Sequence, residues 1–498
     1  MRAMTAPPPN PPADRPPPEG NPRGSHRQDA DATNLPADRP PSERIAEWDR
    51  AYVWHPFTQH KLWNRRDPLV IVAGEGEFLV DACGRRYIDG NSSLWCNIHG
   101  HNHPVINRAI VEQLGRIAHS TLLGLASPPS VLLARRLVEI APAGLTKVFY
   151  SDDGSTSVEA ACKMACGYWH HVGQPQRTEF VALRHAYHGD TIGAVSLGGI
   201  DLFHRLYQPL LFRTHFAPSP YCYRCELGRR PETCGLACAG EVGRILRERS
   251  ERIAAVVVEP RMQCAAGMIA APPGHLREIR RLCDEYGVLL IADEVATAFG
   301  RTGRMFACGH EGVSPDLLCV SKGLTGGYLP LAATLATERI YEAFLGEVDA
   351  GRTFYHGHTF TGNALGCAAA LASLDVFEQE RTLEKLPAKI ERMRQHLARI
   401  ARMPHVGEVR QAGMLAGIEL VRDTSTKEAF PYGRQIGAQV CARAAAHGVI
   451  LRPLADVIVL VPPLSIADES LDRLLTVTQQ CIDEVLVQQR EGAVDGLE

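Results

Sequence analysis

Short aliphatic runs, each ending in a polar residue, mark the middle of the chain. The runs VLLIAD and LLCVSK end at Asp293 and Lys322, and the similar runs KVFY, EFVAL and AAVVVEP precede them. Apolar runs of this length, bounded by turn residues, are typical of strands buried on both faces, although periodicity alone does not exclude buried helix. Because helical patterns alternate with these runs, residues 147–330 are predicted to form a doubly wound, mainly parallel sheet with helices on both faces.

The chain on either side of this region follows a different pattern. Residues 69–90 alternate apolar and polar positions around turn residues at Gly84 and Arg85, which predicts a small antiparallel meander. After about Glu378 the chain becomes charged and helical before it returns to strand-like runs. We therefore expect an α/β protein with a large sheet domain at 91–376 and a small α+β domain built from 45–90 and 377–498.

The first 44 residues have a composition of their own. They hold 12 of the 34 prolines and almost no large apolar side chains. Such a segment cannot bury enough surface to offset the entropy lost on ordering, so residues 1–44 are predicted to be a disordered tail without a function. The segment also lacks the apolar core of a secretory signal.

Charge and cysteine usage narrow the class of protein. The formal net charge is −3, so the chain lacks the basic surface that nucleic acids and anionic membranes attract, and small-molecule chemistry is expected. No apolar run is long enough to span a bilayer. The 15 cysteines are an odd number scattered among aliphatic segments, which is typical of free thiols in a reducing compartment, so a cytoplasmic location is predicted.

Two candidate catalytic side chains follow directly after strand-like runs. Ligands of open α/β sheets lie beyond the carboxyl ends of the strands, which is where Asp293 and Lys322 are expected. A lysine amine in a half-buried cleft loses solvation, so its pKa falls and it becomes a nucleophile toward aldehydes. A nearby carboxylate can keep a heteroaromatic ring nitrogen protonated. Pyridoxal phosphate (PLP) requires this pair of groups, whereas a solvated lysine and a helix-capping aspartate are the alternative interpretation.

Three further positions have side chains suited to a ligand. In FYSDDGSTSVEAACKMA, Gly154 and Ser155 start a predicted helix whose free N–H groups either cradle a phosphate or form an ordinary cap. Tyr187 follows another strand-like run and either stacks on a flat ring or packs in the core. Arg452 interrupts an apolar run, and a buried arginine demands an anion, either a structural carboxylate or that of a substrate.

Four cysteines in PYCYRCELGRRPETCGLAC form a candidate metal site. Cys222 and Cys225 are two residues apart, whereas Cys234 and Cys238 are three residues apart. Four thiolates can hold zinc tetrahedrally, but the second spacing is one residue longer than in the usual knuckle. Free thiols are therefore the favoured interpretation and no metal is predicted. A non-catalytic zinc or thiol-sensing protein is the alternative that this segment leaves open.

The motifs taken together resemble the class III aminotransferases, which are PLP enzymes of fold type I. They are WHPFTQ, GNSSLWCNIHGH, FYSDDGSTSVEAACKMA, YHGDTIGAVS, LLIADEVATAFGRTG, SKGLTGGYLPLAATLAT and HGHTFTGN, and the similarity covers roughly residues 46–487. Within the class they look like the group that converts 8-amino-7-oxononanoate to 7,8-diaminononanoate in biotin biosynthesis. The resemblance implies the PLP-dependent transferase fold, PLP as the cofactor and an obligate homodimer.

The resemblance also implies roles around the cofactor. Lys322 would hold PLP and move a proton between the substrate α carbon and the cofactor C4′ carbon. Asp293 would pair with the ring nitrogen, Tyr187 would cover the ring, and Gly154 with Ser155 would bind the phosphate. A second subunit would complete the phosphate site through two residues of HGHTFTGN, His358 and Thr359.

Substrate contacts are implied in the same way. Arg452 would meet the carboxylate of the long-chain keto acid, and Glu259 and Gln263 would support the site from behind. The full implied set of substrate-binding residues is Phe57, Trp95, Tyr187, Lys322, Gly357 and Arg452.

Departures from the family pattern bear on the amino donor. Many members have Tyr where this chain has Phe57, and Trp-Trp where it has Leu94-Trp95. Both positions look more like the subgroup that uses lysine, whereas S-adenosylmethionine is the default of the family and is the donor predicted here. A competing interpretation is another class III ω-aminotransferase, acting on ornithine, 4-aminobutyrate or a β-amino acid. Such enzymes generally need an arginine for an α-keto acid, and WHPFTQ and GHTFTGN argue against one.

Overall fold

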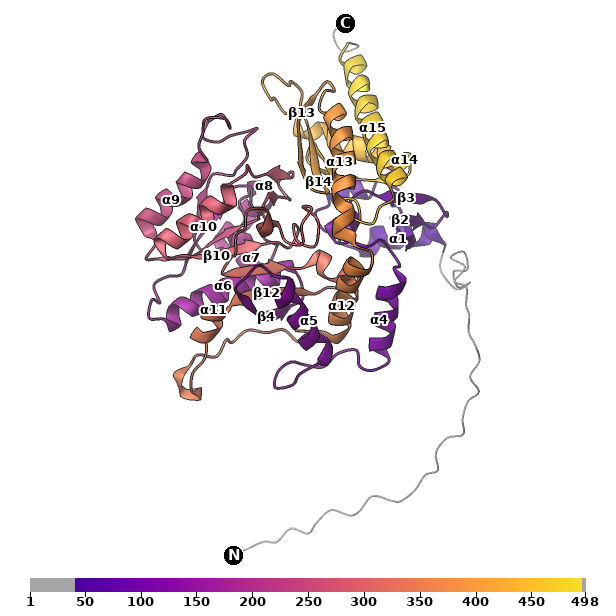
Figure 1. Cartoon of the computed structure of the whole chain (residues 1–498). Coiled ribbons are helices and arrows are strands. Elements are labelled where there is room, and N and C mark those ends of the chain that lie inside the picture. Colours follow the sequence, from indigo (N-terminus) through magenta and orange to yellow (C-terminus); the bar gives the residue numbers. More distant parts are fainter. Residues whose placement is uncertain (1–40, 495–498) are drawn as a thin grey trace, which may run out of the picture. The chain divides into compact units, whose positions relative to one another are not determined.

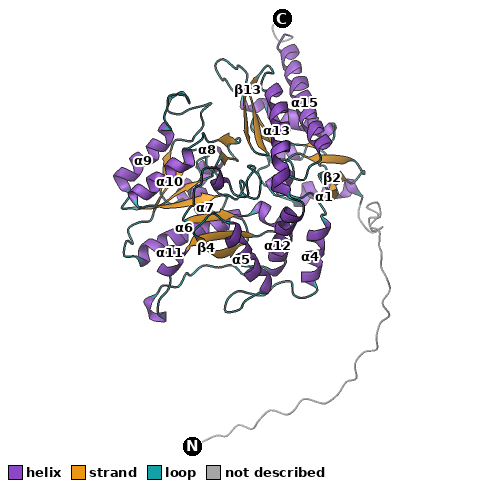
Figure 2. Cartoon of the chain, in the orientation of Figure 1, coloured by secondary structure: helices purple, strands orange, loops and turns teal. Residues whose placement is uncertain are grey.

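The computed structural model describes residues 41–494, and the side chains of residues 41–487 (Figures 1 and 2). The predicted tail at 1–44 lies outside the described residues except at its end, where helix α1 begins (Ser42–Tyr52). The chain divides at Pro68 into two compact units, which are treated separately below. In the first unit Asp49 on α1 accepts hydrogen bonds from His55 Nε2 and from Trp63 Nε1 on α2 (His60–Trp63), both at 2.9 Å.

The second unit is built on a seven-stranded sheet that is parallel except for one strand. That strand, β12, pairs antiparallel with both neighbours. Only residues 321–331 connect it to the preceding strand, which is too short a connection for the crossover that a parallel neighbour needs. In spatial order the strands are β4 (Leu145–Ser151), β12 (Ala332–Thr337), β11 (Leu317–Val320), β10 (Leu289–Asp293), β7 (Ile253–Val258), β5 (Glu179–Leu183) and β6 (Thr214–Ala217).

Helices cover both faces of this sheet, which explains why its central strands are apolar throughout. Along β7, Val256 and Val258 belong to one core cluster, whereas Ala255 and Val257 belong to another. Helices α6 (Gly154–His171) and α11 (Glu338–Ala343) contribute to the second cluster. The first cluster includes α5 (Pro128–Ile140), α9 (Ala237–Arg249), α10 (His275–Tyr286) and α12 (Ala364–Gln379). The predicted doubly wound, mainly parallel sheet is confirmed.

Two smaller sheets lie beside the large one. The first is antiparallel, in the order β13 (Val406–Ala412), β14 (Leu415–Leu420), β17 (Val457–Leu460) and β16 (Arg452–Leu454). Three helices pack around it, α13 (Thr382–Ile400), α14 (Ile436–Ala446) and α15 (Asp468–Val494). The second contains β1 (Ile71–Glu75), β2 (Phe78–Asp81), β3 (Arg86–Asp89) and β15 (Val449–Ile450).

The predicted hairpin at Gly84 and Arg85 joins β2 to β3. Gly84 has a φ of +78°, a conformation that glycine adopts without steric cost, and Arg85 donates its N–H to Asp81 Oδ1 at 2.9 Å. Strand β15 pairs in parallel with β3, so the C-terminal part of the chain adds a strand to the meander. Whether the domain bounds at 90 and 376 describe independent folding units stays a prediction.

The remaining elements are short and lie mostly at the edges of the second unit. None of the described helices combines the length and the apolar character needed to cross a membrane. The short elements of the second unit are α3 (Ser92–Trp95), α4 (Pro104–Leu114), α7 (Ile192–Ser196), α8 (Asp201–His204), β8 (Met262–Gln263) and β9 (Ile269–Ala270).

Candidate active site

The pairing of β10 with β11 brings the two predicted catalytic side chains to one edge of the large sheet. The strands are parallel, with Asp293 opposite Cys319, and Lys322 follows three residues later. Lys322 begins a short 3₁₀ turn with a φ of +46°, a left-handed conformation that residues other than glycine rarely adopt. Backbone strain of this kind persists only where surrounding packing imposes it, and it concentrates at functional sites.

The amine of Lys322 has no protein partner. Its Nζ lies 4.9 Å from the centroid of the Trp95 ring, and no described residue makes a hydrogen bond or ion pair with it. Burial lowers the pKa of Lys322, and the negative charges of Asp293 and Glu259 only partly oppose this effect. A larger fraction of the amine is therefore neutral, and nucleophilic, than in a solvated lysine.

Trp95 is held in place by an unusual turn. Every residue from Ser92 to Trp95 has a positive φ, between +47° and +100°. The indole N–H donates to Asn91 Oδ1 at 3.0 Å, and Ser92 Oγ donates to the carbonyl of Val461 at 2.6 Å. These two bonds offset part of the strain and fix the ring beside the lysine amine.

Asp293 is buried and held in a defined orientation. Its Oδ2 accepts a hydrogen bond from His188 Nδ1 at 2.7 Å, and its Oδ1 accepts the N–H of Val295 at 3.0 Å. Burial alone would lower the pKa of His188, but the hydrogen bond and charge of Asp293 outweigh burial and raise it. The histidine therefore holds this carboxyl group in place, where it could pair with a ring nitrogen.

The predicted phosphate cradle lies against the same strand end. Asp153 and Thr156 form a capping box at the start of α6, and the N–H groups of Gly154 and Ser155 have no partner among the described residues. A Cβ at position 154 would lie 2.5 Å from Val295 Cγ1, so only glycine allows this approach. Free N–H groups at a helix start attract an anion such as phosphate.

Glu259 and Gln263 are buried, and both make hydrogen bonds to the backbone near Tyr187. Glu259 accepts the N–H of Tyr187 at 3.1 Å and that of Cys264 at 2.9 Å, and burial raises its pKa to about 7. The Tyr187 hydroxyl donates to Asp190 Oδ2 at 2.6 Å. Gln263 donates to the carbonyl of Arg184 at 3.0 Å. Glu259 and Gln263 thus anchor backbone, and their supporting role behind the site stays a prediction.

Arg452 is a second candidate ligand-binding cation. It lies half-buried on β16, and within residues 41–487 no hydrogen bond or ion pair to its guanidinium is present. Burial lowers its pKa, and its charge interacts with the Tyr187 hydroxyl. Of the two anions that the sequence left open, a structural carboxylate is excluded within these residues, and a ligand carboxylate is favoured.

The segment around residues 356–359 is irregular and mostly exposed. His358 Nδ1 lies 2.9 Å from Asp152 Oδ2, just ahead of the cradle, and the carbonyl of Thr359 accepts a hydrogen bond from His119 Nε2 at 2.8 Å. Gly357 has open space around its Cα. The roles of Gly357, His358 and Thr359 stay predictions, as does that of Phe57, which belongs to the unit that ends at Pro68.

Two residues with evident roles in this geometry were not predicted. His188 adjoins Tyr187 in the YHG motif, and Val295 lies two residues beyond Asp293 in LLIADEVA. Both sit next to predicted residues in the sequence, and this adjacency was the only available signal. Their functions come from contacts across the fold, with Asp293 and with Gly154. The four predicted cysteines lie in a separate loop and are treated below.

These groups suit one kind of ligand, a flat aldehyde that carries a phosphate and a ring nitrogen. The unpaired amine, the buried carboxyl group of Asp293 and the free helix N–H groups each match one part of it. The geometry therefore fits the predicted cofactor.

Comparisons with known proteins agree with this interpretation. The family profile for aminotransferase class-III matches residues 62–482. Adenosylmethionine-8-amino-7-oxononanoate aminotransferase from Geobacter sulfurreducens is 54% identical over 445 residues, which are 89% of this chain and 98% of that protein. The crystal structure of the enzyme of the same name from Methanocaldococcus jannaschii is 44% identical, with a TM-score of 0.85 and coverage of 89% of this chain and 99% of that one.

An amine transaminase from an uncultivated Pseudomonas species, solved with PLP bound, is also similar. It is 35% identical with a TM-score of 0.83, and the match covers 87% of this chain and 99% of that one. The family profile and the identity to full-length relatives place the chain without ambiguity. It belongs to the class III aminotransferases.

Proposed function

We propose that this chain is the PLP-dependent aminotransferase that converts 8-amino-7-oxononanoate to 7,8-diaminononanoate, with S-adenosylmethionine as the amino donor. The observation that carries the proposal is the unpaired amine of Lys322, next to Trp95 and at the same sheet edge as the buried Asp293. The substrate is inferred from the relatives, since the aminotransferase from Geobacter sulfurreducens is 54% identical over 98% of its length.

PLP supplies an aldehyde for the amine and a protonated ring that withdraws electrons from the reacting carbon. Gly154 and Ser155 bind its phosphate through their free N–H groups. Asp293, supported by His188, holds the proton on the ring nitrogen. Lys322 Nζ removes a proton from the amine-bearing carbon of the donor in the first half of the reaction and returns one to the former keto carbon in the second.

Arg452 gives the site its preference for a carboxylate-bearing chain. A nonanoate carries its carboxylate far from the keto group, so a cation separate from the catalytic lysine suits it. A charge-assisted hydrogen bond to a carboxylate satisfies a guanidinium that the protein leaves without a partner. Burial of Tyr187 raises its pKa, so the hydroxyl stays protonated and remains a hydrogen-bond donor beside Arg452.

The active enzyme is a homodimer in this proposal. Exposed apolar side chains on α4, α5 and the segment between them support it, because monomers rarely leave large apolar surface uncovered. His358 and Thr359 would then serve the phosphate site of the second subunit. All fifteen cysteines are free, which supports the cytoplasm as location. The exposed apolar side chains on α4, α5 and the segment between them are those of Val111, Leu114, Leu123, Leu125, Val131 and Leu132.

Half-reactions with single amino donors test the substrate assignment. The absorbance of the bound cofactor should change to that of its amine form on addition of S-adenosylmethionine, and 8-amino-7-oxononanoate should reverse the change. Conversion by lysine alone would move the chain to the lysine-using subgroup. Conversion by ornithine or 4-aminobutyrate, with no response to 8-amino-7-oxononanoate, would overturn the proposal in favour of an ω-aminotransferase.

A further inference from the structure

The loop between β6 and α9 gathers four thiols around one small cavity. Residues 218–236 contain no regular element, and they border a cavity with a volume of about 20 Å³, room for a single small occupant. Its lining also includes Ser219 and Tyr221, but their hydroxyls are bonded to Gln263 and Glu419. The cavity is lined by all four cysteines of the segment, Cys222, Cys225, Cys234 and Cys238.

The backbone turns tightly after Cys225 and after Cys234. Gly228 donates its N–H to the carbonyl of Cys225 at 3.0 Å, and Ala237 donates to that of Cys234 at 3.2 Å. Gly228, Gly235 and Leu236 all have left-handed φ angles, between +56° and +61°. Two tight turns therefore bring together pairs that are nine residues apart in the sequence.

The electrostatic surroundings favour thiolates that share a cation. Cys238 lies in the first turn of α9, where the positive end of the helix dipole stabilises negative charge. Arg229 lines the cavity and complements the net negative charge of a metal bound by four thiolates.

We propose that this loop binds one zinc ion through four thiolates, those of Cys222, Cys225, Cys234 and Cys238. The site is structural, since four protein ligands leave no open position for a substrate. The longer spacing of the second pair, which argued against a metal in the sequence, is accommodated by the start of α9. Zinc thiolates place sulfur atoms about 3.8 Å apart, for bonds of about 2.3 Å. No three of these sulfurs lie within 4.8 Å of one another, so binding draws them inward.

The benefit of a metal here follows from what the loop holds. Ser219 Oγ donates to Gln263 Oε1 at 2.5 Å, and Gln263 lies behind the candidate active site. Arg224 Nε donates to Glu419 Oε1 on β14 at 2.7 Å, and Lys427 Nζ donates to the carbonyl of Tyr223 at 2.6 Å. The loop thus connects the end of β6 in the large sheet to the sheet formed by β13, β14, β17 and β16, although the loop has no secondary structure of its own.

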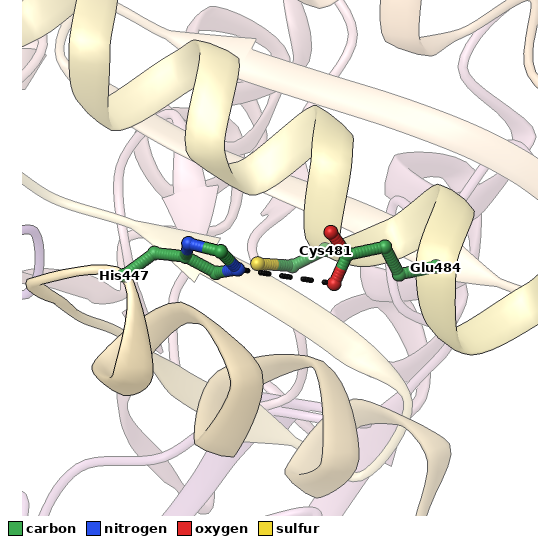
Figure 3. A group of neighbouring side chains, drawn as sticks. All are labelled: His447, Cys481 and Glu484. Atoms are coloured by element: carbon green, nitrogen blue, oxygen red, sulfur yellow. Dashed lines mark ion pairs between the residues drawn. The ribbon is translucent and has the colours of Figure 1, made fainter.

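A second group with metal-binding side chains lies on α14 and α15 but carries no such proposal (Figure 3). The ligand atoms of His447, Cys481 and Glu484 lie within 4.8 Å of one another. However, Arg443 Nη1 is 3.7 Å from the same Glu484 oxygen that faces His447 at 3.9 Å. A guanidinium therefore already supplies the positive charge at this position, and the group offers only three ligands, whereas the cysteine loop offers four thiols.

Metal analysis of the purified holoenzyme tests the proposal without reference to activity. We expect about one zinc per chain, as a closed four-cysteine site requires. Cys222→Ser and Cys238→Ser should each reduce the zinc content to background. The exposed Cys83→Ser and the Glu484→Gln variant should keep it, which separates this loop from the group in Figure 3. Zinc that persists unchanged in both cysteine variants of the loop would overturn the proposal.

Cobalt substitution decides the question even where a loop variant fails to fold. Cobalt bound by four thiolates absorbs strongly at wavelengths beyond those of the PLP chromophore, and wild-type protein loaded with cobalt should show these bands. Their intensity distinguishes tetrahedral thiolate ligation from weak adventitious binding. Wild-type holoenzyme that holds neither zinc nor cobalt with this signature would refute the site.

Discussion

Two arginines on the sheet formed by β13, β14, β17 and β16 differ in whether the protein pairs their charge. Arg410 on β13 is buried and saturated, since Nη1 donates to Glu408 and Glu419, each at 2.5 Å, and Nη2 donates to the carbonyl of Gly267 at 2.7 Å. Arg452 on β16 has no such partner within the described side chains. A charge that the fold desolvates and fully pairs contributes to the fold, whereas one left unpaired keeps its binding capacity for a ligand.

Two cations in the segments that follow strands β10 and β11 of the large sheet show the same contrast. Arg301 is 1% exposed and donates to the carbonyls of Pro462 and Asn97, each at 2.7 Å. Lys322 lies 21 positions later, yet its amine has no hydrogen-bond or ion-pair partner among the described residues and lies 4.9 Å from the centroid of the Trp95 ring. The partners of a buried cation therefore separate candidate catalytic groups from structural ones more clearly than burial does.

Replacing the unpaired lysine should have the largest effect. Lys322→Ala removes the nucleophile and proton carrier, so turnover should fall about 10³-fold or more, while the thermal unfolding midpoint changes little. Single-turnover absorbance measurements with the amino donor check this expectation. Lys147→Ala, at a lysine already paired with Glu338, is the matched control and should retain activity. Comparable rates in both variants would remove Lys322 from its role.

Removing the saturated arginine should instead damage the fold. Arg410→Ala leaves Glu419 buried without its main counter-charge, which costs about 3–5 kcal/mol of unfolding free energy. Chemical denaturation of the holoenzyme measures this loss. A variant with wild-type stability but impaired binding of the keto acid would reverse the contrast between the two arginines.

Arg452→Ala should show the opposite pattern at a smaller scale. The loss of a charge-assisted contact costs about 1.5–3 kcal/mol, so KM for 8-amino-7-oxononanoate should rise by roughly one to two orders of magnitude. Stability should stay the same or increase, because an unpaired half-buried charge is removed. Steady-state kinetics and a melting curve on the same preparation decide, and an unchanged KM would exclude the proposed carboxylate contact.

The smallest effect concerns pH. Glu259 has an ordinary pKa of 4.5 when unfolded and about 7 when folded, so the folded chain binds its proton more tightly. This contribution to stability is complete below pH 4.5 and is lost as pH rises through about 7. Glu259→Gln should therefore flatten the decline of the unfolding free energy with pH in that window, as measured by chemical denaturation. Equal slopes in variant and wild type would show that Glu259 keeps its ordinary pKa in the folded chain.

The sequence predicted those parts of the fold and site that depend on local pattern. Buried strands and their polar ends placed Asp293 and Lys322 at one sheet edge, and the motifs identified the class, which the family match confirms. The helix start at Gly154 was found for the same reason, since caps and glycines act over a few residues.

What escaped the sequence depends on contacts between distant segments. The pairing of His188 with Asp293 joins residues 105 positions apart. Whether Arg452 had a structural carboxylate or none was a fact of tertiary packing, and the sequence left both open. The residues from Ser92 to Trp95 all have positive φ angles, yet none of them is glycine, so no signal in the sequence indicated this conformation.

The contact between Gly154 and Val295 fixes the distance between two of the groups that would hold the cofactor. Gly154 belongs to the group that would bind the phosphate, and Val295 is two residues from the carboxylate that would bind the ring nitrogen. Because no atom fits between them, the spacing of the two anchors cannot adjust to a different molecule. Analogues of the vitamin with an extended phosphate arm would have to give up one anchor, so they should be poor substitutes even though their reactive aldehyde is identical.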